Sequence, residues 1–294
     1  MLKKLLTVSA LLCAMTVNAQ IFNVESTRRV NLPSGVAIEE ALISPDGAKV
    51  AYTQLYAEGL NVLDLATGVE KSVSDKGIAM DMAFAENGTV LVFDEVSYDA
   101  NHTRRVAVKS KDLTSGKTRT LLAPTRTLNG VSVDASGIRT IDNGRISAAS
   151  ERPVLSINMG QLCITRGGTT TVLSPLGSEG MSYMWPSLSP DGRHICFYAA
   201  GLGCYTCNLD GSDTKKLGWL RAAKWYDNET VVGMHDLSDG KFTVSSEIIA
   251  VTRDGSVRQT ISDKNLVAMY PSVAPGKVAF STVDGRLFIL NLKK

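Results

Sequence analysis

The chain has 294 residues, of which 31 are basic and 29 acidic, so its formal net charge is +2. A nucleic-acid binder shows a basic stripe or block, because phosphate contacts dominate its affinity. This sequence contains no such block, which argues against a nucleic-acid partner. The length suits one large domain or two small ones.

The first residues have the pattern of a secretory signal peptide. Lys3 and Lys4 precede an apolar run at 5–17, and Val17-Asn18-Ala19 fits a small-x-small cleavage site. The run is shorter than the ~20 residues that span a bilayer, and no later stretch is long and apolar enough. We therefore expect removal of residues 1–19, a single domain at residues 20–294, and a periplasmic or secreted location.

A lipid anchor is the alternative for the same segment. A lipidated Cys13 would follow small residues, but Leu11 and Leu12 precede it, so no anchor is expected. Cleavage takes away Lys3 and Lys4 and no acid, which leaves 29 basic and 29 acidic residues. The mature chain is thus expected to be neutral overall.

Six copies of a strand–turn–strand unit follow one another along the chain. The clearest copies contain Ser44-Pro-Asp-Gly47 and Ser189-Pro-Asp-Gly192, in which Pro presets φ, Asp bonds its own backbone and Gly accepts a positive φ. One turn residue marks each copy: Asp46, Asn87, Ser136, Asp191, Asn228 and Gly276. The spacings are 41, 49, 55, 37 and 48 residues, and propeller blades repeat every ~40–50 residues.

The expected strands fill these units. In chain order, further strands are expected at 60–65, 203–209, 215–217 and 246–251, and the last unit has only three strands, ending at 287–292. Residues 22–32 would supply its missing strand, which removes an open seam. The prediction is an all-β fold: a six-bladed β-propeller of four-stranded antiparallel blades, closed by an N-terminal strand.

The turns also carry a family resemblance. The apolar-Ser-Pro-Asp-Gly turn, with Leu63-Asp-Leu-Ala-Thr-Gly68 and Asn208-Leu-Asp-Gly-Ser212, resembles the TolB-type, WD40-like propeller repeat, over residues 38–292. The propeller of prolyl oligopeptidase-like enzymes is built from a similar repeat. TolB also has an α/β domain and those peptidases a hydrolase domain, and we expect neither here. The resemblance implies a propeller and a scaffolding role.

Motifs for catalysis and metal binding are missing from the sequence. It contains no Gly-x-Ser-x-Gly elbow, no Gly-rich phosphate loop and no His-Glu-x-x-His helix. The three histidines, His102, His194 and His235, are interpreted as ordinary surface or strand residues. The Asp-rich turns at 210–213 and 236–240 lack a full calcium loop. We expect no catalytic residue, no metal and no cofactor.

Four cysteines remain after the expected cleavage: Cys163, Cys196, Cys204 and Cys207. An exported protein permits disulfides, so one strand-to-strand disulfide and buried free thiols are both open. The strands at 194–198 and 203–209 should form a hairpin, which would bring Cys196 close to Cys204 or Cys207. The pair Cys204-x-x-Cys207 has no second pair at zinc spacing.

A candidate site follows from aligning the repeats, because the first strand of each blade lines the central channel of a propeller. The aligned positions are Glu40, Asp81, Gly130, Trp185, Ala222 and Tyr270, and the preceding layer is Glu39, Met80, Asn129, Met184, Arg221 and Met269. The candidate site at the channel mouth is Glu39, Glu40, Asp81, Asn129, Trp185, Arg221 and Tyr270. Aromatic faces with a few polar groups suit sugars, peptides or small ligands. Alternatively, the aromatics pack between blades and the charges face water.

These residues are compatible with two functions. The first is a monomeric, non-catalytic propeller that binds an envelope or extracellular protein, or a glycan or peptide ligand. The second is an enzyme that degrades a polysaccharide or peptide in the channel, with Glu39, Glu40 or Asp81 as acid or base.

Overall fold

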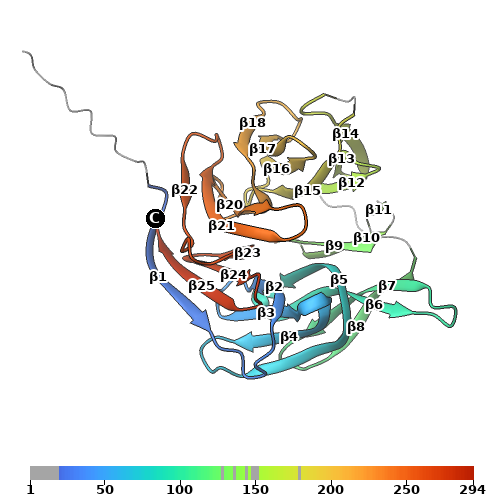
Figure 1. Ribbon diagram of the computed structural model, residues 1–294. Helices are drawn as coiled ribbons and strands as arrows, with labels where there is room; N and C mark the ends of the chain where they lie inside the picture. The colour runs from blue at the N-terminus through green and yellow to red at the C-terminus, as the bar shows by residue number, and fades with distance from the viewer. Residues whose placement is uncertain (1–19, 127–128, 135–136, 143–144, 147–151, 178–179) are drawn as a thin grey trace, which may run out of the picture.

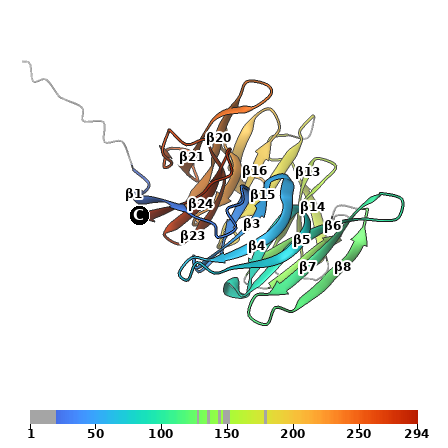
Figure 2. The ribbon, with the colours of Figure 1, turned by 60° about the horizontal axis from the view of Figure 1, so that its bottom comes forward.

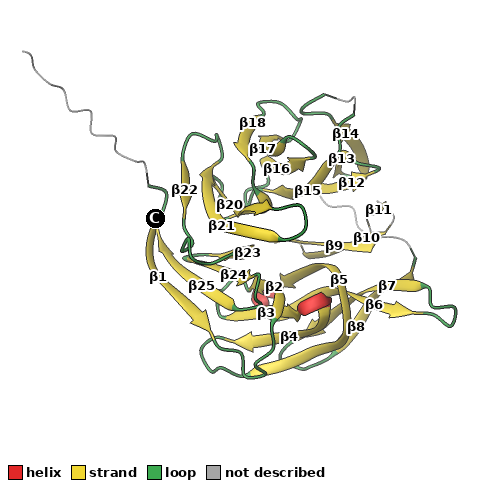
Figure 3. Cartoon of the chain, in the orientation of Figure 1, coloured by secondary structure: helices red, strands yellow, loops and turns green. Residues whose placement is uncertain are grey.

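The computed structural model describes residues 20–126, 129–134, 137–142, 145–146, 152–177 and 180–294. These residues form strands β1 to β25 and two single 3-10 turns, η1 (Leu55–Ala57) and η2 (Glu86–Gly88), as Figures 1 and 3 show. In the described part, no helix is long and apolar enough to cross a membrane. The proposed signal peptide at 1–19 lies outside the described residues and stays a prediction.

The N-terminal half begins with two four-stranded antiparallel sheets that share one strand. In order, the strands are β2 (Ile38–Ile43), β3 (Lys49–Gln54), β4 (Glu58–Asp64), β5 (Glu70–Ala85), β6 (Val90–Tyr98), β7 (Arg104–Asp112) and β8 (Thr118–Thr125). Residues 70–77 of β5 pair with β4, whereas residues 78–85 pair with β6. The long strand β5 is therefore the outer strand of one sheet and the first strand of the next.

The C-terminal half forms three four-stranded antiparallel sheets. Two of them run in chain order: β15 (Tyr183–Leu188), β16 (His194–Ala199), β17 (Gly203–Asn208), β18 (Lys215–Gly218), and β19 (Arg221–Trp225), β20 (Thr230–Ser238), β21 (Thr243–Thr252), β22 (Arg258–Thr260). The third is β23 (Ala268–Ala274), β24 (Lys277–Thr282), β25 (Leu287–Lys293) and β1 (Asn23–Val30). Thus the first strand of the chain completes the last sheet.

The middle of the chain departs from the expected blade count. Its described strands form two three-stranded sheets: β9 (Asn129–Asp134), β10 (Gly137–Asp142), β11 (Arg145–Ile146), and β12 (Val154–Asn158), β13 (Gln161–Arg166), β14 (Thr169–Leu173). A single four-stranded blade was expected there, so six four-stranded blades are not confirmed. The turns at Met159-Gly160 and Gly167-Gly168 make tight hairpins of β12, β13 and β14, and these three strands pair only with one another among the described residues.

Sheets packed on both faces explain the apolar runs in the central strands. In β20, residues Thr230 to Met234 are all buried, and in β24 Val278 to Thr282 are all buried. A strand covered on both faces loses the alternation of apolar and polar residues. Figure 2 shows successive sheets lying face to face, and the first strands of neighbouring sheets touch: β23 contacts β2 and β19, and β15 contacts β12 and β19.

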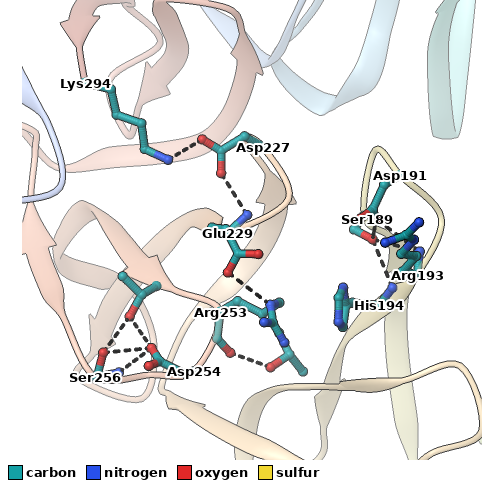
Figure 4. Close-up of polar contacts among 12 residues, drawn as sticks. Ser189, Asp191, Arg193, His194, Asp227, Glu229, Arg253, Asp254, Ser256 and Lys294 are labelled. Carbon is teal, nitrogen blue, oxygen red and sulfur yellow. Dashed lines mark hydrogen bonds and ion pairs between the residues drawn. The ribbon is translucent and has the colours of Figure 1, made fainter.

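The Ser-Pro-Asp-Gly turn is held by its own side chains (Figure 4). Gly192 N donates to Ser189 O at 2.8 Å and has a φ of 70°, which favours glycine. Ser189 Oγ donates to Asp191 Oδ1 at 2.6 Å and accepts the amide of His194 at 3.0 Å. The copy at 44–47 repeats these contacts. The motif is therefore a self-satisfied turn that starts the second strand of a blade.

The predicted pairing of the two chain ends is confirmed. β1 pairs antiparallel with β25, from Asn23 opposite Lys293 to Val30 opposite Leu287, and the two lie side by side in Figure 1. Just before β1, the side chain of Gln259 in β22 clamps the chain: its Oε1 accepts the amides of Ile21 and Phe22, and its Nε2 donates to Phe22 O. The start of the chain is thus tied to two sheets.

Candidate functional site

The aligned positions lie in a backbone irregularity that recurs in five sheets. The first strand of each of these sheets shifts register against the second, between the residue pairs 38/41, 78/82, 184/187, 221/224 and 269/272. Glu40, Asp81, Trp185, Ala222 and Tyr270 all fall inside these shifts. These five residues therefore occupy equivalent places in their sheets.

The sixth position differs. Gly130 and its neighbour Asn129 pair regularly with Ile141 and Asp142, with no register shift. The side chains of Asp81 and Asn129 lie outside the described part of the chain, so their place in the candidate site stays a prediction.

Three of the bulge residues have a left-handed backbone. Trp185, Ala222 and Tyr270 have φ values of 50°, 48° and 48°. A bulge leaves one residue unpaired and re-aims its side chain, and a β-bulge often lies next to a functional site. A left-handed conformation is costly for any residue other than glycine. The fold therefore holds Trp185 and Tyr270 in a conformation that free chains avoid.

Trp185 is the centre of an aromatic and ionic cluster. Its ring centroid lies 5.4 Å from that of Tyr198, and the guanidinium carbon of Arg221 lies 5.8 Å from its centroid. Arg221 Nη1 donates to Asp236 Oδ2 at 2.5 Å, and the Asp236 side chain is only 7% exposed. A carboxylate so buried needs a charged partner, and Arg221 supplies it. Trp185 itself remains 42% exposed.

Tyr270 lies in the same electrostatic environment. Burial raises the pKa of its phenol, the charges of Glu39, Glu40 and Asp236 raise it further, and the charge of Arg221 opposes them. Its amide donates to Met234 Sδ at 3.4 Å. At neutral pH the phenol is therefore a proton donor for hydrogen bonds. We call Trp185, Tyr198, Arg221, Asp236 and Tyr270 the bulge site.

Glu39 has a structural task at the edge of this site. Its Oε2 accepts the amide of Ala57 at 2.8 Å, and its backbone carbonyl accepts the hydroxyl of Ser281 at 2.7 Å. Ala57 and Tyr56 in η1 both have positive φ, so the Glu39 carboxylate stabilises an unusual turn. The structure therefore brings Glu39, Glu40, Trp185, Arg221 and Tyr270 together, with Glu39 also tied to η1.

A hollow adjoins the bulge site on the side of Arg221. It has a volume of about 270 Å³. The residues that line it are Trp219, Arg221, Met234, His235, Asp236, Leu237 and Ser238. Trp219 is 52% exposed and Leu237 is 54% exposed, whereas Met234 is buried. The hollow thus combines exposed apolar groups with one ion pair.

Sequence reasoning missed Tyr198, Asp236 and Trp219. Tyr198 and Asp236 lie on the second strands β16 and β20, and Trp219 lies just before the first strand β19. The aligned positions were all on first strands. One signal was available: Asp236 and Tyr198 are polar or aromatic residues near the end of second strands that begin as apolar runs. The Asp-rich turn at 236–240, which was considered as a calcium loop, contains hydrogen bonds to its own backbone: Asp239 Oδ1 accepts the amides of Lys241 and Phe242. Among the described residues, no group of three or more His, Cys, Asp or Glu side chains could hold a metal.

The prediction that Cys196 lies close to Cys204 is confirmed. Cys196 Sγ and Cys204 Sγ lie 3.5 Å apart on the hairpin of β16 and β17, and both side chains are buried. All four described cysteines are free thiols, because a disulfide needs its sulfurs at ~2.05 Å. Burial raises the pKa of Cys207 to about 12, so this thiol is not a nucleophile at neutral pH.

No protein-family model and no curated protein sequence matches the chain. Solved structures do match it. A chain of a mitotic checkpoint complex is 11% identical, with 96% of this chain and 99% of that chain covered and a TM-score of 0.61. A putative TolB from Agrobacterium tumefaciens is 16% identical, with coverages of 88% and 91% and a TM-score of 0.56. At these identities the likeness shows the fold alone: this chain has a TolB- and WD40-like propeller fold.

The prediction of a non-catalytic role is contradicted, because the structures similar to this chain include enzymes. The similar structures include enzymes: an oligogalacturonate lyase in complex with manganese, 17% identical over 86% of this chain and 76% of that chain with a TM-score of 0.47, and the tricorn protease, 14% identical over 88% and 26% with a TM-score of 0.56. The expectation rested on missing sequence motifs. A propeller site is assembled from strands far apart in the sequence, so missing local motifs do not exclude catalysis.

Proposed function

We propose that the bulge site binds an oligosaccharide. The observation that carries this proposal is the arrangement of Trp185, Arg221 and Asp236: a half-exposed indole beside a fixed ion pair. A sugar ring has an apolar C–H face and a rim of hydroxyls. The indole offers a surface for the face, and planar charged groups accept or donate paired hydrogen bonds to neighbouring hydroxyls.

The setting of the site favours a sugar over an extended peptide. A peptide that binds by adding a strand to a sheet needs a free strand edge for its backbone. The bulge site lies on first strands and on the second strands that pair with them, and the first strands also contact neighbouring sheets. The strained, preformed backbone also lowers the cost of ordering the site when a ligand binds.

A second candidate is acid–base chemistry on the bound sugar. The observation that favours it is that the charges of Glu39, Glu40 and Asp236 all act on Tyr270. Paired carboxylates at suitable spacing cleave glycosidic bonds. We assign proton transfer to Glu40, because it lies inside the register shift of β2 and its charge acts on the phenol of Tyr270.

The wider context of this function is also proposed. We infer that the sheets close into a ring, joined where β1 pairs with β25. We also infer that residues 1–19 are a cleavable signal peptide, which would place the mature chain in the periplasm or outside the cell. An exported propeller would meet envelope or environmental glycans there.

The test uses an array of neutral and acidic oligosaccharides, followed by calorimetric titration of each hit. We expect wild-type protein to bind, and Trp185→Ala to lose at least tenfold in affinity, about 1.4 kcal/mol. Tyr98→Ala is the matched control, because Tyr98 is also an exposed aromatic, 66% exposed, but lies on β6. Equal affinity of wild type and Trp185→Ala would refute the proposal. New reducing ends that appear with wild type and vanish with Glu40→Gln would establish the second candidate.

A further inference from the structure

We infer that the binding region continues past Arg221 to a second aromatic platform, Trp219, so that the ligand spans at least two sugar units. This inference rests on the proposed function. It adds a second subsite and a minimum length of the ligand, and binding at the bulge site alone requires neither.

Arg221 is shared by both platforms. Its guanidinium lies 5.8 Å from the centroid of Trp185, and the same side chain lines the hollow that contains Trp219. The ion pair with Asp236, which also lines the hollow, holds the guanidinium in place. A single sugar ring on Trp185 leaves the hollow unused, whereas a chain of rings runs from one platform across Arg221 to the other. The hollow, at about 270 Å³, suits one ring rather than a large ligand, because drug-sized sites span ~300–1,000 Å³.

The backbone of Trp219 is anchored on both sides. Arg258 donates from Nη1 to Leu217 O at 2.8 Å and from Nη2 to Trp219 O at 3.0 Å. Gly218 has a φ of 87°, and a Cβ there would come within 3.2 Å of Arg258 Nη1. The next residue, Leu220, is fully buried. An exposed tryptophan on such a fixed backbone is preorganised for contact.

The hairpin of β20 and β21 forms the outer wall of this second subsite. Leu237 lines the hollow, and Phe242 and Val244 nearby in the hairpin are 63% and 56% exposed. The loop keeps its shape because Asp239 accepts two of its amides. Figure 2 shows this hairpin projecting from the end of its sheet. Neighbouring exposed apolar side chains are typical of a binding surface, whereas isolated ones are common anywhere on a protein.

The chemistry of the hollow fits a sugar ring. Trp219 offers an apolar face, and His235 and Ser238 lie in the lining with polar groups for hydroxyls. The Asp236 carboxylate has a second oxygen, and a carboxylate has about four acceptor sites, of which the bond to Arg221 uses one. A hydroxyl of the second ring therefore has an acceptor within the wall that both subsites share.

The experiment is a chain-length series of the best saccharide from the array, from one to five units, titrated by calorimetry. For wild type we expect affinity to rise by tenfold or more between the shortest and the longer ligands. In Trp219→Ala this rise should disappear while affinity for the shortest ligand stays within twofold. Trp219→Phe should restore part of the rise, since it restores an aromatic face. Thermal melting of each variant checks that it is folded.

The outcomes separate this inference from the proposed function. If wild type binds and Trp185→Ala loses binding, but Trp219→Ala keeps the full rise with chain length, the second subsite is wrong and the bulge site stands. If no saccharide of any length binds wild type, both are wrong. Tyr98→Ala, which removes an exposed aromatic side chain on β6, is the control and should keep the wild-type rise.

Discussion

The left-handed backbone of Trp185, Ala222 and Tyr270 is the clearest sign at the scale of single residues that the bulge site is specialised. Each such residue costs roughly 1–2 kcal/mol relative to an ordinary conformation, and the three φ values agree within 2°. Strain of this kind persists where the surrounding structure enforces it, and it clusters at functional sites. Two of the three residues carry the aromatic rings of the site. The strain therefore has a use: it aims those rings out of the sheet.

Ala222 allows this strain to be measured without touching the aromatic rings. Glycine adopts a positive φ at no steric cost. We expect Ala222→Gly to raise the free energy of unfolding by about 0.5–1 kcal/mol. Urea unfolding followed by circular dichroism measures the change. The neighbour Ala223 is similarly half-buried and has no positive φ, so Ala223→Gly should lower stability by about 0.5–1 kcal/mol. Equal destabilisation by both changes would contradict the argument.

The site could be predicted from the sequence only where the repeats carry a strong turn signal. The Ser-Pro-Asp-Gly turns fix the register of β2 and β15, and Glu40 and Trp185 both fall inside the register shifts of these strands. Asp236 and Trp219 could not be found in this way. Their partners Arg221 and Arg258 are 15 and 39 residues away in the sequence. Contacts between strands and turns at such separations depend on packing, which a local pattern does not encode.

At the scale of strands and sheets, the fold was predictable except in the middle of the chain. Hairpin rhythm predicts the all-β class and the pairing of β1 with β25. The spacing of 55 residues between Ser136 and Asp191 was interpreted as one long blade, but the described strands β9 to β14 in this part of the chain form two three-stranded sheets. The turn at Met159-Gly160 has no Pro or Asp, so it did not stand out as the start of a further unit. The sheet of β12, β13 and β14 was therefore missed, because the sequence of its first turn is not typical of a turn.

The clamp by Gln259 is the element that joins the start of the chain to the neighbouring sheet. Gln259→Ala removes three hydrogen bonds to Ile21 and Phe22. Because Phe22 is buried, its amide would lose its partner out of water, whereas its carbonyl keeps the hydrogen bond from Gln20 Nε2. We expect a loss of about 1–3 kcal/mol in the free energy of unfolding. Urea unfolding measures it.

Two further variants sharpen this test. Gln259→Glu keeps the acceptor for both amides but loses the donor to Phe22 O, so its stability should fall between wild type and Gln259→Ala. Gln161→Ala removes an exposed glutamine from β13 and should stay within ~0.5 kcal/mol of wild type. If Gln259→Ala behaves like Gln161→Ala, the clamp contributes nothing to stability.

Across the whole molecule, one device recurs: an aspartate that accepts hydrogen bonds from its own turn. Such bonds lower the pKa of four turn aspartates: Asp64, Asp112, Asp210 and Asp239. Hydrogen bonds from Thr252 and Ser256 lower the pKa of Asp254 to about 2. Hydrogen bonds from Arg105 and from the amide of Thr103 lower that of Asp99 to about 2. The turns between neighbouring strands of the sheets therefore depend on ionised carboxylates.

This dependence predicts a molecule that loses stability in acid. A carboxyl with a lower pKa in the folded state than its unfolded value of ~3.9 stabilises the fold fully above about pH 4–5, and this contribution is lost as the pH falls toward 2. We expect the urea midpoint to be constant from pH 6 to 5 and to fall steadily between pH 4 and 2.5. Asp254→Asn keeps an acceptor oxygen but cannot titrate, so its midpoint should fall less over that interval. Glu25→Gln removes the same charge from an exposed position on β1 and should follow wild type. A wild-type midpoint that holds or rises between pH 4 and 2.5 would show that the turn carboxylates do not stabilise the fold.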